Sequence, residues 1–248
     1  MSRGGAGARV AVTTRVVRDP AHGELRDALS RDWYPLLEGL GITPLLVPNV
    51  EDAVADYLGG IELQGLILTS GNNVCPETYR VEDTGVPDTS PARDRTERLL
   101  IDAAVAGGLP ILGVCRGMHI LNAHFGGKLL PDLSRITSEG HVARVHEIEI
   151  LRPDWTEVFG CTSLRVNSFH DQGLTETELS RELAAFARTG AGIIEGFVHP
   201  ALPIVGIQWH PERENPASAF DRALLAGLFL KGDLGPVGAG WKRAAGGS

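Results

Sequence analysis

Short apolar runs alternate with helical patterns along the first half of the chain. The runs predict buried strands, because continuous apolar stretches between turn signals are typical of parallel sheets. They lie at residues 9–14, 44–48, 63–68 and 110–114. Apolar residues at helical spacing predict helices at residues 24–40, 51–58, 91–106 and 117–125. Strands and helices in this alternation predict an α/β fold with a mostly parallel, doubly wound sheet flanked by helices.

The pattern changes after Gly127. Polar and apolar residues alternate at 146–150, 183–188 and 193–199, which predicts antiparallel strands with one solvated face, added to the parallel sheet. A further apolar run at 202–208 predicts another buried strand, and the spacing at 217–230 predicts a closing helix. We therefore expect a small antiparallel addition and one domain.

The domain is expected to span residues 9–231. A glycine-rich lead-in at 1–8 and a glycine-rich tail at 232–248 predict disorder at both ends. Residues 74–91 are rich in Pro, Asp and Thr and predict a long surface loop that orders on demand.

Charge and cysteine content restrict the functional class. The chain has 248 residues and a net charge of −8, from 31 acidic and 23 basic residues, which argues against a nucleic-acid or membrane partner. Three cysteines form no disulfide framework and indicate a reducing compartment. No stretch has the length of a membrane span, and residues 1–8 lack a signal-peptide core. We expect a cytoplasmic protein.

One cysteine stands where a strand turns directly into a helix. Gly113 and Gly117 flank Cys115 at −2 and +2, the pattern of a nucleophile elbow. Glycines there let strand and helix approach closely. The sulfur would project at the carboxyl end of the sheet and at a helix N-terminus, which favours the thiolate. The alternative is a small core cysteine after a strand. Cys75 and Cys161 have no partner motif and are expected to be bystanders.

A cysteine nucleophile needs a base, and the base needs an orienting group. His210 follows a buried strand, as Cys115 does, and Glu212 lies two residues further along. The loop Ser70-Gly71-Asn72-Asn73 ends another strand and could turn an N–H group toward the sulfur. Both segments are also compatible with ordinary turns that end a strand.

Three segments resemble the class I glutamine amidotransferases. They are Gly-Val-Cys-Arg-Gly-Met at 113–118, Val-Asn-Ser-Phe-His at 166–170 and Gly-Ile-Gln-Trp-His-Pro-Glu at 206–212. The closest likeness is to the branch of γ-glutamyl hydrolases that cleave γ-glutamyl amines. The resemblance implies a flavodoxin-like fold and a catalytic triad of Cys115, His210 and Glu212.

The resemblance also implies an oxyanion hole and a glutamyl pocket. One oxyanion donor is the backbone N–H of Arg116, and the other comes from Gly71 or Asn72. The pocket is implied for four consecutive residues, Asn167, Ser168, Phe169 and His170.

Two positions depart from the family pattern. His119 replaces a usual glutamine, and Asn72 replaces a usual glycine. His119 lies one helical turn after Cys115. It is therefore expected either to give one hydrogen bond to the glutamyl group or to pack beneath the elbow.

The predicted reaction is hydrolysis of a γ-glutamyl amide bond, which releases glutamate and an amine. It needs no cofactor and no metal, and its partner is a small γ-glutamyl molecule; a homodimer is left open. Arg15 and the stretch Arg26–Leu29 followed by Asp32-Trp33 resemble a subgroup that hydrolyses γ-glutamyl-CDP-amidate in surface-sugar pathways. The alternative for this stretch is an amphipathic helix with a charged face.

Three other functions remain as alternatives. A glutaminase subunit that supplies ammonia to a separate synthase would use the same triad. A cysteine α/β-hydrolase acting on esters would place the acid before the histidine, whereas Glu212 follows His210. A binding module would hold the γ-glutamyl ligand without turnover.

Overall fold

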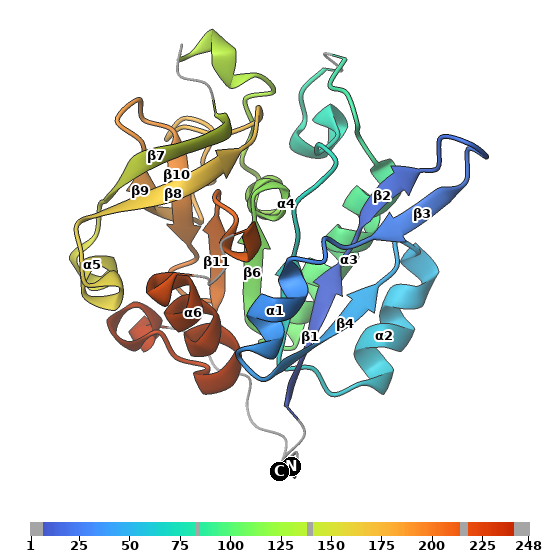
Figure 1. Cartoon of the computed structure of the whole chain (residues 1–248), viewed down its shortest axis with the longest axis horizontal. Helices are drawn as coiled ribbons and strands as arrows, with labels where there is room; N and C mark the ends of the chain where they lie inside the picture. Colours follow the sequence, from blue (N-terminus) through green and yellow to red (C-terminus); the bar gives the residue numbers. More distant parts are fainter. Residues whose placement is uncertain (1–6, 83–84, 138–140, 214–217, 241–248) are drawn as a thin grey trace.

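A nine-stranded sheet organises the computed structural model, which describes residues 7–82, 85–137, 141–213 and 218–240 (Figure 1). Five of its strands are parallel. In spatial order they are β4 (Ile42–Val47), β1 (Ala8–Thr13), β5 (Gly65–Leu68), β6 (Ile111–Val114) and β11 (Ile204–Ile207). This is the flavodoxin-like order, in which ligands bind at the carboxyl ends of the strands beside the switch point. The predicted α/β fold class is confirmed.

Four antiparallel strands extend the sheet beyond β11. They are β10 (Ile194–Val198), β9 (Ala184–Arg188), β7 (Val142–Ile150) and β8 (Ser163–Phe169). The alternating segments predicted three of them, and β8 is an addition. β10 is buried along its whole length and not on one face only, because its side chains belong to both hydrophobic clusters of the core.

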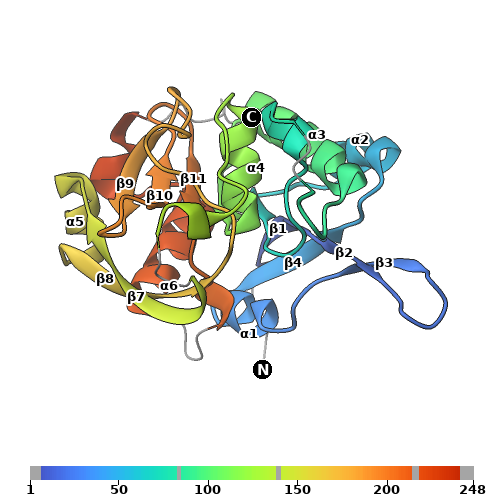
Figure 2. The ribbon, with the colours of Figure 1, turned by 90° about the horizontal axis from the view of Figure 1, so that it is seen from above.

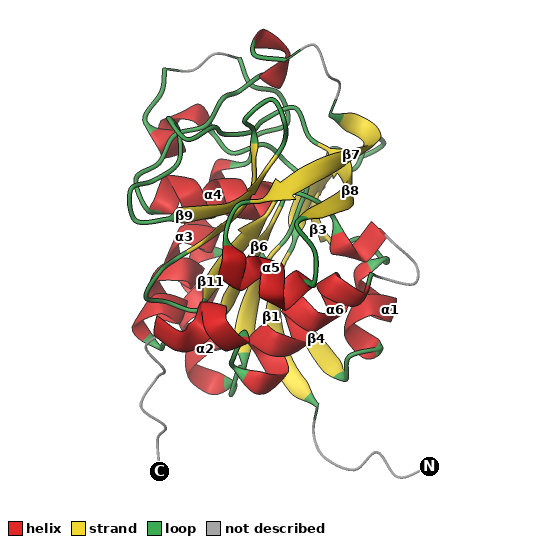
Figure 3. Cartoon of the chain, turned by 90° about the vertical axis from the view of Figure 1, so that its left-hand side faces the viewer, coloured by secondary structure: helices red, strands yellow, loops and turns green. Residues whose placement is uncertain are grey.

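Helices cover both faces of the sheet, and each face has its own hydrophobic cluster (Figure 3). One cluster includes side chains of α1 (Trp33–Glu38), α5 (Pro153–Phe159) and α6 (Ala219–Ala226). The other includes side chains of α2 (Val54–Gly60), α3 (Pro91–Ala106) and α4 (Arg116–His124). A π-helical turn at Gly227–Lys231 continues α6. Among the described residues, no helix is long and apolar enough to cross a bilayer.

The turn between β6 and α4 depends on two glycines. A Cβ atom on Gly117 would lie 2.0 Å from the carbonyl oxygen of Leu68, and one on Gly113 would lie 2.5 Å from the carbonyl oxygen of Gly117. Cys115 between them has φ 53° and ψ −108°, a conformation that non-glycine residues rarely adopt. The glycines therefore permit the contact that brings the start of α4 against β5.

The helix predicted over 24–40 is wrong for most of its length. Only α1 is helical, and residues 25–28 form strand β3 (Leu25–Ala28), which pairs with β2 (Arg15–Arg18). The reason is the turn after Asp19 that joins β2 to β3. The Asp19 carboxylate stabilises this turn by accepting hydrogen bonds from the N–H groups of Ala21 and His22 at 2.8 and 3.0 Å. Apolar spacing in the strand was mistaken for helical spacing.

The β2–β3 hairpin projects from the body of the molecule at the right of Figure 1, and Figure 2 shows the same from above. The side chain of Asn72 fastens its base. The Asn72 amide accepts from the N–H of Val16 and donates to the Val16 carbonyl, both at 2.9 Å. The hairpin is thereby tied to the loop that follows β5.

The expected disordered tail does not begin at residue 232. Residues Gly235–Gly240 form a 3-10 helix, and Leu234 and Val237 are buried in the same cluster as α5. The glycine-rich composition predicted disorder, but Leu234 and Val237 among the glycines pack against the core. Residues 241–248 and 1–6 of the predicted tail and lead-in lie outside the described residues, and Ala8 already belongs to β1.

The long loop predicted at 74–91 is also partly packed. Residues Pro76–Tyr79 form a 3-10 helix, and Tyr79 is buried against the cluster that includes α3 and α4. Residues 83–84 lie outside the described part of the chain.

The Gly117→Ala variant should be strongly destabilised. Its new methyl group would meet the Leu68 carbonyl, so either α4 or β5 must shift, and we expect a loss of about 3 kcal/mol in the free energy of unfolding. Gly59→Ala in α2 is the matched control, since no atom from outside the helix lies within 4 Å of its Cβ position among the described residues, and it should gain about 0.5 kcal/mol. Urea unfolding followed by circular dichroism measures both; an unchanged midpoint for Gly117→Ala would contradict the packing described here.

Candidate active site

Cys115 lies at the carboxyl end of β6 and directly before the first residue of α4. Its backbone N–H donates to the Ile207 carbonyl at 2.8 Å, which fixes it against the end of β11. The residue is 7% exposed and lines a cavity of about 210 Å³. The first N–H groups of α4 have no partner within the helix, and the helix dipole there favours negative charge.

His210 comes from the segment that follows β11. Its Nδ1 lies 2.8 Å from Oε1 of Glu212, and both side chains are buried. Asn167 on β8 holds the backbone of His210 from both sides: its Oδ1 accepts from the His210 N–H at 2.9 Å, and its Nδ2 donates to the His210 carbonyl at 2.8 Å. Glu212 and Asn167 together fix the orientation of the imidazole.

Cys115 and His210 perturb each other's pKa values. Burial would raise the pKa of the Cys115 thiol, but the neighbouring His210 outweighs it, and the thiol pKa lies below its usual range. Burial would lower the pKa of His210, but the Cys115 sulfur and then the Glu212 carboxylate raise it to about 9. The pair therefore favours a thiolate beside an imidazolium at neutral pH.

The cavity beside Cys115 includes six of the other residues predicted from the sequence. Gly71, Asn72, Arg116, His119, Phe169 and His170 line it together with Cys115 and His210. Asn167 and Ser168 are not among the lining residues, because Asn167 is engaged by His210 and the Ser168 hydroxyl donates to the His141 carbonyl at 2.6 Å. Glu212 lies behind His210.

The loop after β5 faces the elbow across the cavity. Gly71 has φ 96°, and a Cβ atom there would lie 2.8 Å from Cβ of Arg15. The amide of Asn72 is occupied by Val16 and by Asp88, to which it donates at 2.9 Å. Gly71 and Asn72 therefore line the cavity, while the Asn72 side chain holds the loop in place.

A buried charge network beneath the cavity was missed by sequence reasoning. The Arg116 guanidinium pairs with Asp94 and Glu97 on α3, and Arg93 Nε donates to Glu97 at 2.9 Å. Burial would raise the Glu97 pKa, but Arg116 and Arg93 hold it below its usual range. The i,i+4 spacing of Arg93 and Glu97 was the available signal.

This network also holds the loop after β5. The Arg93 guanidinium donates to the carbonyl oxygens of Thr69 at 2.7 Å and Ser70 at 3.0 Å. Burial, followed by the charge of Arg116, lowers the Arg93 pKa to about 10. The side chain of Arg116 is thus held in this buried network, and Arg116 is the first residue of α4.

His119 contacts a partner that the sequence did not indicate. Its Nε2 lies 2.8 Å from Oε1 of Gln208, and burial, with the charge of His170, lowers its pKa to about 3. The ring is therefore neutral, with Nε2–H donating to Gln208 and an acceptor lone pair on Nδ1. Nδ1 has no hydrogen-bond partner among the described residues.

The other two cysteines lie away from this site. All three cysteines are free, and neither Cys75 nor Cys161 lines the cavity. Burial, reinforced by Asp94, raises the pKa of the Cys75 thiol to about 12. The thiol pKa of Cys75 is therefore raised whereas that of Cys115 is lowered, and Cys75 can serve as an internal control.

Comparison with known proteins identifies the family. The model of the family named Peptidase C26 matches residues 10–212. The chain belongs to the peptidase C26 family. The resemblance drawn from the three sequence segments is confirmed at this level.

Two relatives and one solved structure illustrate the membership. The peptidase C26 chain is 31% identical to the glutamine amidotransferase-like protein YvdE of Lactococcus lactis, over 82% of this chain and 88% of that protein. It is 30% identical to γ-glutamyl-γ-aminobutyrate hydrolase PuuD of Escherichia coli K12, over 75% and 76%. The glutaminase domain of Trypanosoma brucei CTPS, solved with bound acivicin, has a TM-score of 0.65 at 12% identity and covers 90% of this chain and 94% of that chain. This last likeness shows a shared fold, while the family and the two relatives support a C–N hydrolase.

The thiol of Cys115 should alkylate fastest of the three cysteines at neutral pH. The thiolate reacts, so the iodoacetamide rate should fall as the pH drops through the lowered thiol pKa and persist above it. Cys75 should stay slow until the pH approaches 12. Peptide mass spectrometry over a pH series measures each site.

The variant His210→Ala removes the counter-charge. Burial, which raises the thiol pKa of Cys115, is then no longer outweighed by His210. The rate at which iodoacetamide alkylates Cys115 at neutral pH should therefore fall at least about tenfold, which corresponds to a rise of one pKa unit. Equal rates for Cys115 in both proteins would contradict the ion pair.

Proposed function

We propose that this chain hydrolyses a γ-glutamyl amide bond with Cys115, His210 and Glu212. The Cys115 thiolate attacks the γ-carbonyl carbon to form a tetrahedral intermediate. The His210 imidazolium donates its Nε2 proton to the departing amine, and the C–N bond breaks to leave a γ-glutamyl thioester. Water then gives a proton to His210 and attacks the thioester, which releases glutamate and the thiolate.

The observation that carries this proposal is the meeting of Cys115 and the His210–Glu212 pair in one buried cavity. Three residues from the ends of two adjacent parallel strands reach the same point, and the geometry at His210 is tight, with 2.8 Å to Glu212. Glu212 orients the ring and stabilises its charge during both steps. Every step uses only side chains, backbone groups and water, so the proposal requires no cofactor.

Backbone N–H groups are proposed to stabilise the oxyanion. The N–H of Arg116 belongs to the first turn of α4, and Gly71 and Asn72, whose N–H groups would supply the other donor, line the same cavity. The charge network of Arg93 and Arg116 supports both sides of this arrangement. Such donors cost no reorganisation when the charge develops.

The glutamyl group is proposed to lie against His119, Phe169 and His170. The neutral His119 ring keeps Nδ1 as an acceptor, which suits the α-ammonium of a glutamyl group. Asn167 and Ser168 are reassigned from binding to positioning, because their polar atoms contact His210 and His141 instead of the cavity.

The amine half is proposed to be anionic. Arg15 and Arg213 line the rim of the cavity, and Arg213 lies over the Phe169 ring at 4.1 Å. Arg15 is 3.5 Å from Asp88, an exposed pair that leaves its guanidinium available to solvent. A carboxylate, as in γ-glutamyl-γ-aminobutyrate, or a diphosphate, as in γ-glutamyl-CDP-amidate, would suit this rim. The alternative, a glutaminase subunit for a separate synthase, uses the same residues with ammonia as the leaving group.

A substrate panel tests the reaction and its alternative. Glutamate release should be fast with γ-glutamyl amines that carry an anionic amine half, slower with neutral ones and slowest with glutamine. The Cys115→Ala variant should lose all turnover and keep its circular dichroism spectrum. Full activity in that variant would refute the mechanism, and release from glutamine alone would favour the glutaminase subunit. Tight γ-glutamyl binding without release in the wild type would indicate a binding module.

Replacement of Asn167 should mainly lower kcat. The Asn167→Ala variant frees the His210 backbone, and misplacement of the base by a fraction of an ångström should cost about 10–100-fold in kcat with little change in KM. Ser168→Ala is the control on the same strand, since Ser168 contacts His141 and not His210, and should change kcat by less than about threefold. Steady-state kinetics on the preferred substrate distinguish the two; a rise in KM alone for Asn167→Ala would instead support direct substrate binding.

Substitutions of His119 test its contact with the glutamyl group. His119→Gln keeps a donor and an acceptor and should preserve activity. His119→Ala should raise KM about tenfold, the loss of one hydrogen bond, with kcat retained. Unchanged kinetics in the alanine variant would leave His119 with only its packing role and its contact to Gln208.

A further inference from the structure

A cluster of three histidines and one glutamate, of which all but His146 are buried, adjoins the cavity at His170. Glu195 on β10 has no exposed surface, and its Oε1 lies 3.4 Å from Nε2 of His146 and 3.6 Å from Nε2 of His170. The ring centroids of His141 and His170 are 5.0 Å apart, and those of His141 and His146 are 5.4 Å apart. Among these residues only His170 lines the cavity of Cys115. The proposed hydrolysis gives Glu195, His141 and His146 no chemical role.

Glu195 and two of the imidazoles are only loosely paired. Both carboxylate oxygens of Glu195 and the Nε2 atoms of His146 and His170 have no hydrogen bond of normal geometry within the described residues, although both imidazoles lie near enough to Glu195 to pair with its charge. Burial of a carboxylate in this state is costly, and buried charges in proteins are generally paired or coordinate metals. The separations of 3.4 and 3.6 Å leave Glu195 with ion-pair neighbours but no short contact.

The orientation of His170 is that of a metal ligand. Its Nδ1–H donates to the carbonyl of Gln172 at 2.8 Å, which fixes the tautomer. In the neutral ring, which is the form that binds metals, the lone pair of Nε2 is on the side of Glu195, 3.6 Å from its Oε1. Histidines that bind metals generally donate their other N–H to a carboxylate or a backbone carbonyl in this way.

The spacing of the donor atoms suits one ion. One nitrogen each of His141 and His170 and one oxygen of Glu195 all lie within 4.8 Å of one another. A single point therefore lies within about 2.8 Å of all three, compared with about 2.0–2.2 Å for zinc bonds to nitrogen and oxygen. Shifts of less than about 1 Å at each side chain would complete the bonds.

We propose that His141, His170 and Glu195 bind one divalent transition-metal ion of the zinc type, with a water molecule in the fourth position. Two imidazoles with one carboxylate are a zinc-like donor set, whereas calcium and magnesium prefer oxygen ligands alone. The ion would connect the residue before β7, the residue after β8 and the second residue of β10. Its binding would therefore stabilise the antiparallel part of the sheet and one wall of the cavity.

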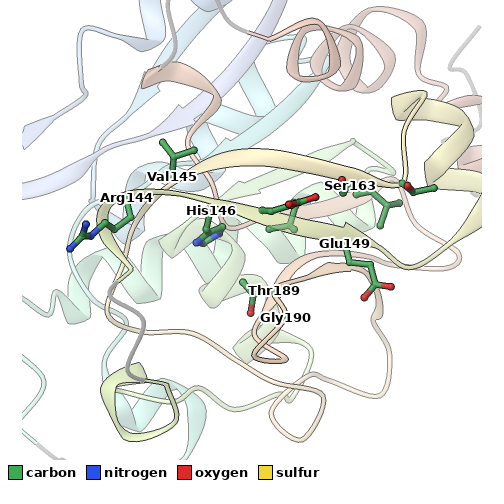
Figure 4. Close-up of a pocket in the computed structure, with 11 residues that line it drawn as sticks. Arg144, Val145, His146, Glu149, Ser163, Thr189 and Gly190 are labelled. Carbon is green, nitrogen blue, oxygen red and sulfur yellow. The ribbon is translucent and has the colours of Figure 1, made fainter.

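A second hollow, whose lining residues are drawn in Figure 4, includes His146 of the cluster. It has a volume of about 980 Å³, lies over β7 and the start of β8, and is lined by His146, Arg144 and Thr189 among others. Its lining residues are all different from those of the Cys115 cavity. His146, with a side chain 18% exposed, is thus the member of the cluster that an incoming ion meets first.

Zinc titration of the chelator-treated, full-length protein tests the site. Calorimetry should give one zinc ion per chain for the wild type and for Cys115→Ser. The variants Glu195→Gln and His141→Ala should bind at least about 100-fold more weakly, because loss of an outer-sphere partner alone costs 10–100-fold. Saturating zinc should raise the melting temperature of the wild type and of Cys115→Ser, but not that of the two ligand variants. Circular dichroism before titration establishes that each variant is folded.

Cobalt absorption on the wild type gives an answer that needs no ligand variant. Binding at the cluster predicts visible bands of a four-coordinate ion without a sulfur charge-transfer band. Absence of stoichiometric zinc or cobalt binding by the wild type would overturn the proposal. So would a sulfur charge-transfer band together with loss of binding in Cys115→Ser, since the ion would then lie on the catalytic thiolate. These outcomes are independent of glutamate release, so the proposed hydrolysis can fail while the metal site stands.

Discussion

The close approach of helix α4 to strand β5 is the constraint on which the site depends. A Cβ atom on Gly117 would lie 2.0 Å from the carbonyl oxygen of Leu68. The helix can therefore begin directly after Cys115 only because residue 117 has no side chain. The turn holds Cys115 at φ 53°, at a cost of about 1–3 kcal/mol for a strained residue. This turn places Cys115 and Arg116, the first residue of α4, at the same cavity. The proposed chemistry at Cys115 therefore depends directly on the packing at the elbow.

Buried polar contacts, more than apolar packing, fix the groups around this elbow. Arg116 next to the nucleophile and Arg93 below it share the carboxylates of α3, and Arg93 also binds the carbonyl oxygens of Thr69 and Ser70. On the opposite side, Asn167 holds the backbone of His210 and Glu212 holds its ring. Removal of one member from such a network leaves the others buried without partners, and this lowers the stability of the folded protein.

Local patterns predicted the elements that carry the site. The apolar run before Cys115, its flanking glycines and the strand before His210 are each local patterns of a few consecutive residues, and they predicted the parallel sheet and the elbow. The β2–β3 hairpin could not be predicted in this way. Its turn depends on the Asp19 carboxylate, and its base depends on Asn72, which lies 56 residues from its partner Val16.

The remaining features rest on contacts between distant residues. Asn167 was expected to bind substrate because of its segment, but its contact with the backbone 43 residues away gives it a different position. Gln208 beside His119, 89 residues apart, is of the same kind. The surroundings of Glu195 are set by strands that pair only in the folded sheet. The sequence alone indicated which residues could react, and the fold determined which of them face the cavity.

The most direct test of the central claim is detection of the covalent intermediate. Wild-type protein mixed with a γ-glutamyl amide and quenched rapidly in acid should carry one γ-glutamyl group on the peptide that contains Cys115, identified by mass spectrometry. The label should appear before steady-state glutamate release and disappear when the substrate is consumed. Glutamate release without any label on Cys115, or with the label on another residue, would contradict the account.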